Sequence, residues 1–200
     1  MKRALLFAIL LFVAAPAAAL DVDVEPVFVL STERHEGTPY DRAVALAAPY
    51  KGGGHIGIVL NRPLEVTLAE LFPEFAPAAK VAEPVYFGGE LRSNAIFALV
   101  RAQAQPSEQS IPMSPGVWLV EDSPTIDRII EATPNQARYY IGRLYWRPGT
   151  LRGFIDEGKL AAAPADASKL FLPDTSKLYD ELAPAGPRPA GARSARLGRI

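Results

Sequence analysis

Glycine and proline cut this chain into short apolar segments, and this division limits the available folds more than any other feature. The segments at 26–32, 42–49 and 116–122 are each bounded by turn residues, as buried strands are. Strand-like segments outnumber helical ones and do not alternate with them regularly, which argues against a doubly wound sheet. We therefore predict an α+β fold: a single compact domain with a mixed, largely antiparallel, barrel-like β-sheet and a few short flanking helices.

Three consecutive glycines in the stretch "YKGGGHIGIVLNRP" join two of these strand-like segments. A Walker-type phosphate loop needs G-x-x-x-x-G-K-[ST] in front of a helix, and a Rossmann fingerprint also opens a helix. The residues after Gly54 instead have the pattern of a strand. The glycines thus predict the turn of a β-hairpin, because such turns require positive φ angles.

Capping residues mark the expected helices. Thr67 and Glu70 have the spacing of a capping box, which predicts a short amphipathic helix after Thr67. A second helix is predicted with Ser123 as its N-cap, and a third ends at Gly158. A last short helix is expected over residues 176–182.

The first 19 residues have the three parts of a secretory signal peptide. Two basic residues come first, an apolar stretch follows, and small residues suit cleavage near Ala19/Leu20. A membrane anchor would need an apolar run of roughly 18 residues, but Pro16 interrupts this one. We expect a periplasmic or secreted protein whose mature form, starting at residue 20, does not span the membrane.

Charge and cysteine content exclude several classes of function. The predicted mature chain carries 19 basic and 22 acidic residues, a balance that does not suit phosphate contacts with nucleic acid. The chain has no cysteine, which excludes disulfides, thiol catalysis and thiolate zinc sites. No cofactor and no metal site are predicted.

Residues 184–200 are rich in proline, glycine and arginine, which predicts a disordered tail after a domain over residues 20–183. The four arginines of this tail are dispersed. They raise a minor alternative, contact with an anionic surface of lipid or polysaccharide.

The sequence Asn61-Arg62-Pro63 follows a buried-looking strand and has two interpretations. In the structural one, Asn61 ends the strand through side-chain hydrogen bonds to the backbone, and Arg62 pairs with a carboxylate such as Glu70 or Glu90. In the functional one, Arg62 holds an anionic ligand. The residues alone favour the structural role.

His35 lies close in sequence to Glu33 and Asp41, and a histidine beside carboxylates can bind a metal or transfer protons. No second histidine stands at ligand spacing, so a solvated polar loop is the favoured interpretation. No G-x-S-x-G elbow and no other catalytic motif is recognisable in the chain.

Aromatic side chains are concentrated in "ARYYIGRLYW", which reads as a strand. Regular alternation would place Tyr139 and Tyr145 on one face and Tyr140 and Trp146 on the other. Core packing is favoured for these aromatics, although an exposed Trp146 beside Arg62 would suit protein binding.

The order and spacing of these motifs resemble those of the YqgE/AlgH family of bacterial proteins, from about Pro26 to Leu182. The strongest matches are "GIVLNRP" at 57–63, the helix at 68–71, "YFGG" at 86–89 and "WRPGTL" at 146–151. The resemblance implies a compact α+β domain on a mixed, barrel-like sheet, without an established activity, cofactor or catalytic site. One branch of the family is linked to regulation of exopolysaccharide production. Most relatives lack a signal peptide, so this chain resembles an exported member.

Two hypotheses for the function follow. The favoured one is a non-catalytic binding or interaction domain of the bacterial cell envelope, with an envelope protein as partner and a regulatory role. The alternative is a small-ligand-binding protein or a hydrolase-like enzyme with a site around His35, Glu33 and Asp41. The candidate ligand- or partner-binding residues are Asn61, Arg62, Pro63, Gly88, Gly89, Glu90, Trp146, Gly149 and His35.

Overall fold

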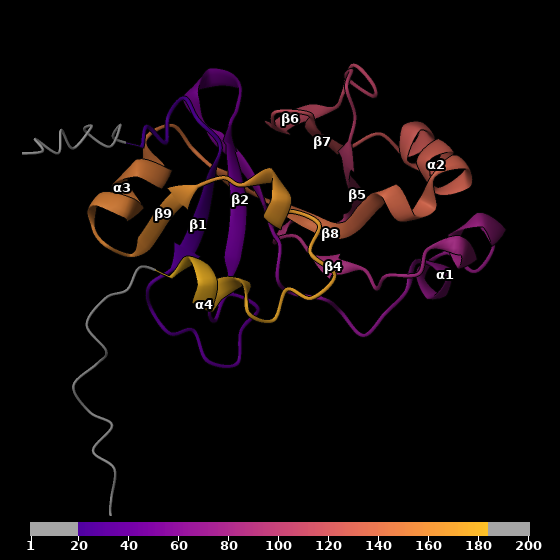
Figure 1. The fold of residues 1–200 in the computed structure, drawn as a ribbon, viewed down its shortest axis with the longest axis horizontal. Coiled ribbons are helices and arrows are strands. Elements are labelled where there is room, and N and C mark those ends of the chain that lie inside the picture. The colour runs from indigo at the N-terminus through magenta and orange to yellow at the C-terminus, as the bar shows by residue number, and fades with distance from the viewer. Residues whose placement is uncertain (1–19, 184–200) are drawn as a thin grey trace, which may run out of the picture.

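A nine-stranded sheet forms the centre of the molecule in the computed structural model, which describes residues 20–183 (Figure 1). The predicted signal peptide (1–19) and the predicted tail (184–200) lie outside the described residues. The strands are β1 (Val27–Ser31), β2 (Val44–Pro49), β3 (His55–Val59), β4 (Tyr86–Phe87), β5 (Leu91–Arg101), β6 (Ile111–Ser114), β7 (Val117–Val120), β8 (Ala137–Trp146) and β9 (Leu160–Pro164). The helices are α1 (Leu68–Leu71), α2 (Ser123–Ala132), α3 (Thr150–Asp156), α4 (Leu178–Leu182) and the 3-10 turns η1 (Lys51–Gly53), η2 (Ala76–Lys80), η3 (Pro134–Gln136) and η4 (Ala167–Lys169).

The strands follow the order β6-β7-β5-β8-β3-β2-β1-β9, and β4 pairs with β8 beside this path. The β4–β8 pair is parallel and every other pair is antiparallel. The prediction of a mixed, largely antiparallel sheet with a few short helices is thus confirmed. The sheet is not closed, however, because β6 and β9 end it on either side. The sheet is therefore open and curled, and it does not form the barrel-like arrangement that the sequence predicted.

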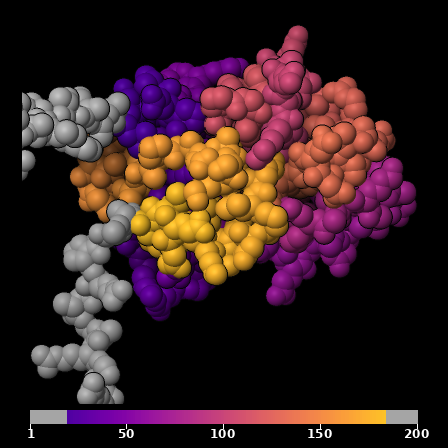
Figure 2. Space-filling model, viewed as in Figure 1, coloured from indigo at the N-terminus to yellow at the C-terminus, as the bar shows by residue number. Residues whose placement is uncertain are grey.

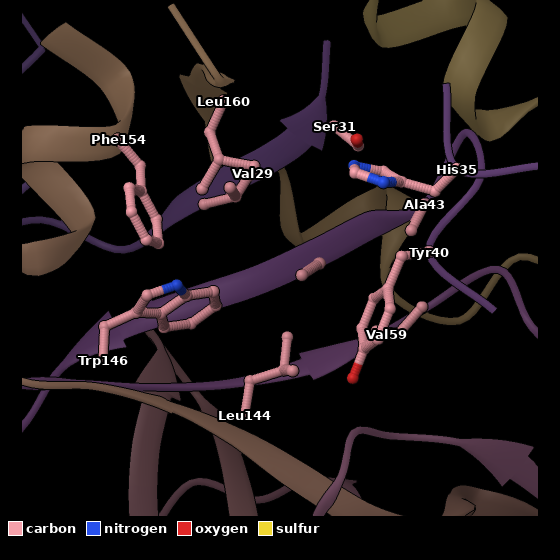
Figure 3. Close-up of a pocket in the computed structure, with 11 residues that line it drawn as sticks. Val29, Ser31, His35, Tyr40, Ala43, Val59, Leu144, Trp146, Phe154 and Leu160 are labelled. Carbon is pink, nitrogen blue, oxygen red and sulfur yellow. The ribbon is translucent and has the colours of Figure 1, made fainter. Parts of the chain in front are cut away.

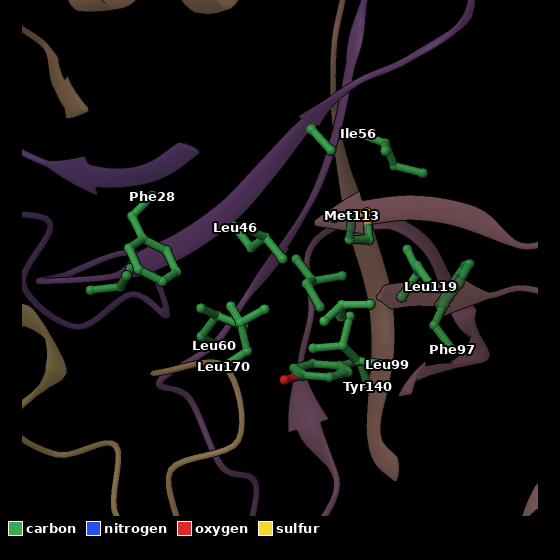
Figure 4. Packing of buried hydrophobic residues seen from close by; sticks show 14 of the residues in the cluster. Phe28, Leu46, Ile56, Leu60, Phe97, Leu99, Met113, Leu119, Tyr140 and Leu170 are labelled. Atoms are coloured by element: carbon green, nitrogen blue, oxygen red, sulfur yellow. The ribbon is translucent and has the colours of Figure 1, made fainter. Parts of the chain in front are cut away.

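The curled sheet encloses one main core, which draws apolar side chains from both of its halves. Phe28 and Leu46 come from β1 and β2, and Leu99 and Leu119 from β5 and β7, and all four are fully buried (Figure 4). The segment after β9 covers the inner face, where Leu170 completes the cluster. Figure 2 shows this C-terminal part, in orange and yellow, lying across the molecule between the first strands and the middle of the chain.

Strand β8 connects the two halves of the sheet through a bend at Gly142, whose φ is +68°. Before the bend, β8 pairs with β4 and most of β5; after it, β8 pairs with Leu91 of β5 at Arg143 and then with β3. The bend also shifts the alternation of side chains, so that Tyr139 packs on the outer face and Tyr140 in the inner core, but Trp146 lies outside as well. The predicted strict alternation, with Tyr140 and Trp146 on one face, is wrong at this glycine.

Different elements cover the outer face of each half. Over β5, β7 and the first part of β8 lie α1, η2 and α2, which bury Leu68, Ala78 and Ile126. Over β1, β2 and β3, of the elements within residues 20–183, lie α3 and the segment that precedes β1, which bury Leu151 and Val22. His55 Nε2 donates to the carbonyl oxygen of Val22 at 2.7 Å and so fixes this segment to β3.

Local sequence signals predicted several elements correctly. The three glycines turn the hairpin between β2 and β3, in which Pro49 faces His55. Thr67 and Glu70 form the capping box of α1. One detail differs: Asp122 rather than Ser123 caps α2, because its carboxylate accepts from the Thr125 backbone N–H. Gly88-Gly89 do not turn a hairpin, because the segments on both sides of them pair with β8.

Among the residues that the structure describes, no helix combines the length and apolar character needed to cross a membrane.

Candidate binding groove between α3 and the 32–43 loop

A groove of about 230 Å³ lies on the outer face of the β1–β2–β3 half, between α3 and the loop at residues 32–43. Phe154 and Trp146 lie on one side of the groove, and His35 and Tyr40 on the other (Figure 3). We call it the α3 groove. Its lining is Val29, Ser31, His35, Tyr40, Ala43, Ala45, Val59, Leu144, Trp146, Phe154 and Leu160.

Small side chains make the floor of the α3 groove. Along β2 the residues alternate, so Val44 and Leu46 point into the main core while Ala45 points outward. Ala43 and Ala45 leave the sheet surface shallow there, and both are almost fully buried. Helix α3 covers the neighbouring part of this face through Leu151. The groove is therefore the part of an apolar sheet face that α3 leaves open.

Two glycines place the aromatic side of the groove. Trp146 lies close against β3 at Gly57, where an added Cβ would come within 2.7 Å of the indole ring. Any larger residue at position 57 would displace the indole. Gly149 precedes α3 with a φ of +74°, and the helix that starts there carries Phe154 to the groove.

The opposite side is the 32–43 loop, and Asn61 and Arg62 hold it in place. Asn61 is 6% exposed; its Oδ1 accepts from Val44 N at 2.9 Å and its Nδ2 donates to Arg42 O at 3.0 Å. Arg62 Nε donates to Pro39 O at 2.8 Å, and burial lowers the pKa of this guanidinium. Both side chains thus tie the loop to the end of β3.

The expected ion pair of Arg62 with Glu70 or Glu90 is wrong. Within residues 20–183 no carboxylate lies within salt-bridge distance of Arg62. Glu70 instead accepts from the backbone N–H and the hydroxyl of Thr67 at 2.7 and 2.9 Å, and these bonds lower its pKa. Arg62 therefore holds the loop by donating a hydrogen bond to a backbone carbonyl oxygen, and this role requires no carboxylate.

Tyr40 provides a neutral hydroxyl at the loop side. Burial, followed by the nearby carboxylate of Glu90, raises the pKa of Tyr40 to about 12. Glu90 itself lines an adjoining hollow of about 350 Å³, which shares Tyr40 and Leu144 with the α3 groove. Tyr145 also lines that hollow, so the aromatic surface continues from one depression into the next.

His35 lines the groove without a carboxylate on its ring. Asp41 Oδ1 accepts from the backbone N–H of His35 at 3.2 Å, and Thr38 Oγ1 donates to the carbonyl oxygen of His35 at 2.8 Å. These contacts shape the loop backbone. Across residues 20–183, no three histidine, aspartate or glutamate side chains converge as a metal site. The arrangement supplies a polar end to an apolar groove, and it contains no paired acid and base.

Gly88 and Gly89 are not part of the groove lining and instead join strands. Gly88 N donates to Ile141 O at 2.8 Å, and Val59 N donates to Gly88 O at 3.0 Å. An added Cβ at Gly88 would lie 2.2 Å from the carbonyl oxygen of Gly142. Pro63 forms an isolated bridge to Tyr86 nearby.

The structure thus divides the nine candidate residues into two groups. His35 and Trp146 line the groove, and Glu90 lines the adjoining hollow. The residues that hold surrounding backbone are Asn61, Arg62, Pro63, Gly88, Gly89 and Gly149. The sequence analysis missed Tyr40, Ala45 and Phe154, although alanines at the alternate positions 43, 45 and 47 signal a sheet face with little side-chain bulk.

Larger hollows occur elsewhere and contain none of the nine candidate residues. One of about 480 Å³ lies beside α1, α2 and β5, with Arg92, Asn94 and Asp127 in its lining. Another of about 570 Å³ lies beside Tyr50 and Glu108. Charged and amide side chains occur throughout their linings, whereas the α3 groove is lined mainly by apolar groups.

Comparison with known proteins identifies relatives across most of the chain. The protein-family model described as DUF179, AlgH-like, matches residues 28–186. A UPF0301 protein of Mycobacterium tuberculosis is 27% identical over 158 residues, covering 76% of this chain and 77% of the relative. A UPF0301 protein of Chlorobaculum parvum is 22% identical over 143 residues, covering 70% and 74%.

Two solved structures share the fold. The AlgH protein of Pseudomonas aeruginosa superposes with a TM-score of 0.65 at 18% identity, covering 82% of this chain and 90% of that one. A protein of Corynebacterium diphtheriae superposes with a TM-score of 0.62 at 19% identity, covering 83% and 88%. Family model, relatives and fold agree, and the chain belongs to the AlgH-like family, whose function is uncharacterised.

Proposed function

We propose that this domain is a non-catalytic binding module of the cell envelope, whose α3 groove takes one apolar side chain of a protein partner. The observation that carries the proposal is the open apolar floor at Ala43 and Ala45, bounded by Trp146 and Phe154 on one side and Tyr40 on the other. A groove of this kind is where a partner's anchor residue gains most from desolvation.

The size of the groove selects a single side chain. Pockets for drug-sized ligands span about 300 to 1,000 Å³. A volume of about 230 Å³ lies below that range and suits one aromatic or branched aliphatic group. Phe154 is 36% exposed at the edge of the groove, so the partner's neighbouring residues would find apolar surface beside the anchor.

The polar end of the groove would orient the partner. Tyr40 keeps its hydroxyl proton at neutral pH as an ordinary tyrosine does, and burial and Glu90 raise its pKa further, to about 12. A neutral hydroxyl can donate to a carbonyl oxygen of the partner's backbone. His35, from the same loop, adds an imidazole that can donate or accept. The Tyr40 hydroxyl and the His35 imidazole could thus form hydrogen bonds with the partner's backbone next to its anchor residue, and neither bond requires a charged ligand.

The envelope location rests on residues 1–19, whose pattern is that of a signal peptide. Mass spectrometry of the chain recovered from a periplasmic or culture fraction would test it. A mature N-terminus near Leu20 is expected, and an intact Met1 in the cytoplasmic fraction alone would contradict the location.

Binding is tested with N-acetylated amides of phenylalanine, leucine, lysine and serine, titrated into the isotope-labelled chain from Leu20 to Ile200. We expect the phenylalanine and leucine probes to shift the NMR signals of Val59 and the Trp146 indole N–H. Lysine and serine probes should leave them unchanged. Shifts of equal size with all four probes, or with none, would refute an apolar anchor site.

Two alanine variants provide the matched comparison. Ala45→Leu fills the floor of the groove, so it should abolish the shifts while keeping or slightly raising the melting temperature. Ala162→Leu adds the same atoms to the same sheet face, in β9, outside the groove lining. It should bind the phenylalanine probe as the unmodified chain does.

A further inference from the structure

The charge of this chain is divided unevenly along its length. Residues 20–183 carry 15 basic and 22 acidic side chains, a formal charge of −7. Residues 184–200 carry four arginines and no acidic residue. A short basic segment is thus attached to an acidic domain, and the two attract each other over distances comparable with the Debye length.

The basic segment follows α4, which packs on the inner core through Leu178 and is bonded to residues at the border of the α3 groove. The Tyr179 hydroxyl donates to Ser31 O at 2.7 Å, and Ser31 lines the groove. Asp180 of α4 pairs with Arg42, the residue before the floor residue Ala43. Helix α4 is therefore tied to the end of β1 and to the 32–43 loop, which both border the groove.

Acidic side chains stand on both sides of the groove. Glu33 and Asp41 lie in the 32–43 loop, and Asp156 ends α3 on the opposite side. Glu36 and Glu157 already pair with Arg34 and Lys159. Within residues 20–183, by contrast, Glu33, Asp41 and Asp156 have no cation within salt-bridge distance.

The basic segment also contains apolar residues of suitable size. Leu197 and Ile200 are its only large apolar residues, and arginines flank Leu197 at positions 196 and 199. The 14 residues from Ala183 to Leu197 can span up to about 50 Å when extended. A segment of that reach can turn back from the end of α4 toward the outer face of the sheet.

From these observations we propose that residues 184–200 dock across the α3 groove of the same molecule, with Leu197 in the apolar floor and the arginines against the acidic sides. The inference rests on the proposed function, because it assigns the groove an occupant that an envelope partner must displace. A short tether gives an effective concentration of the order of 1 mM, so even an intrinsic dissociation constant of about 1 mM leaves roughly half of the molecules docked.

The absence of cysteine allows a direct test. Ser194→Cys in the chain from Leu20 to Ile200 gives a single attachment point for a nitroxide spin label. We expect the label to broaden the NMR signals of Val29, Ala45 and Val59 selectively, and tenfold dilution of the protein should not reduce the effect. Broadening that is absent, or equally strong in α2, would overturn the inference, and loss on dilution would assign it to a second molecule.

A variant of the anchor separates apolar docking from simple charge attraction. Leu197→Asp in the labelled chain should remove the selective broadening, whereas Ala195→Asp keeps Leu197, makes the same change of charge and should preserve most of it. Equal loss in both variants would mean that charge alone holds the segment. That result would overturn the placement of Leu197 in the groove.

Vesicles that contain anionic phosphatidylglycerol test whether the basic segment binds a membrane instead of the groove. If the label reports vesicle binding but no broadening at the groove, the segment is a membrane contact and the inference is wrong. The phenylalanine probe keeps the two proposals apart: a groove that binds this probe but shows no broadening overturns only the docking of residues 184–200. A groove that binds neither overturns both.

Discussion

The outer faces of the two halves of the curled sheet differ in their side chains and in how far other elements cover them. The β5–β7 half carries Val100, Val120 and Tyr139 outward and buries them under α1, η2 and α2. The β1–β2–β3 half carries the small Ala45 and Ala47 outward beside Val27 and Val29, and α3 and the segment before β1 cover part of it. Large side chains anchor a covering layer, and small ones leave a floor on which something else can be placed.

The comparison shows how one sheet can supply both stability and a site. Burial of large apolar side chains contributes about 25 cal/mol per Å² removed from water, so the helix-covered face stabilises the fold strongly. The alanine face has less area to bury, and leaving part of it open forfeits less stability. A groove is therefore tolerated best where the sheet is lined with alanine.

The bend that joins the halves should give the largest effect on stability. An added Cβ at Gly142 would lie 2.1 Å from Gly89 O, and the φ of +68° is unfavourable for any L side chain. Gly142→Ala should lower the free energy of unfolding by about 3 kcal/mol or more, from strain and overpacking together. Urea denaturation followed by circular dichroism measures the change.

Gly149→Ala is the matched control for this bend. Its φ of +74° resembles that of Gly142, but no atom lies within 4 Å of an added Cβ. Only backbone strain remains, which costs about 1 to 2 kcal/mol. Equal losses in the two variants would show that close packing at Gly142 adds nothing, and that the halves are not held together there.

The ion pairs of the two halves should also contribute differently to the free energy of unfolding, and the pair in the helix-covered half should contribute more. Arg138 is 1% exposed and pairs with Glu83, which is 43% exposed, at 2.7 Å, whereas Arg152 of α3 is 41% exposed and pairs with Asp23 at 2.6 Å. Glu83→Gln should lower the free energy of unfolding by about 2 kcal/mol, because it leaves a buried guanidinium without its counter-charge. Asp23→Asn should change it by less than about 1 kcal/mol.

Thermal unfolding at 0.1 and 1 M salt checks this contrast. The loss caused by Glu83→Gln should persist at high salt, because counter-ions cannot reach the buried guanidinium of Arg138. The small effect of Asp23→Asn should vanish. A larger effect of Asp23→Asn would mean that the segment before β1, which this pair helps to fix, matters more than the buried pair.

The sequence predicted what depends on neighbouring residues and missed what depends on distant ones. The hairpin glycines and the Thr67–Glu70 capping box act within a few residues, so the local pattern was sufficient. The pairing of β4 with β8 joins residues more than 50 positions apart, and no local signal specifies it. Strand β9, with the sequence "LAAAP", was missed because alanine has little preference for strands.

The candidate groove was predictable only in part. Trp146 and His35 stood out as unusual residues, and both line the groove. Alanines form its floor, and an alanine lines a groove only where larger residues from other elements stand around it. The sequence around Ala43 and Ala45 does not show which residues those are. The side formed by Phe154 depends on where α3 crosses the sheet, and no local sequence pattern specifies that position.

Two asparagines allow a smaller comparison between the halves. Asn61 bonds Val44 N and Arg42 O and is buried, whereas Asn135 bonds Ala82 N and Lys80 O at 3.0 and 3.2 Å and is exposed. Asn61→Ala should cost about 1 to 2 kcal/mol, because it leaves buried backbone groups without partners. Water can replace the amide of Asn135, so Asn135→Ala should cost less.

The same pair separates the groove from general stability. Asn61 holds the 32–43 loop, so Asn61→Ala should weaken binding of the N-acetyl-phenylalanine amide probe even well below the melting temperature. Asn135→Ala should leave it unchanged, because η2 lies on the other half of the sheet. Unchanged probe binding by Asn61→Ala would mean that the loop contributes nothing to the groove.

The smallest expected effect is the titration of Tyr40. Burial and the Glu90 carboxylate raise its pKa to about 12 in the folded state, while an unfolded tyrosine ionises near pH 10. Between these values the unfolded chain holds fewer protons than the folded one, so the free energy of unfolding falls as pH rises. Because Tyr40 is only half-buried, the contribution should stay below about 1 kcal/mol.

Tyr40→Phe removes this ionisation and should make the fall in stability between pH 10 and 12 shallower. Tyr50→Phe is the control, a half-buried tyrosine outside the α3 groove. Below pH 10 the Tyr40 phenol is protonated in both states, so Tyr40→Phe should weaken probe binding by a constant factor from pH 6 to 9. Unchanged probe binding by Tyr40→Phe would instead mean that the Tyr40 hydroxyl contributes nothing to the polar end of the groove.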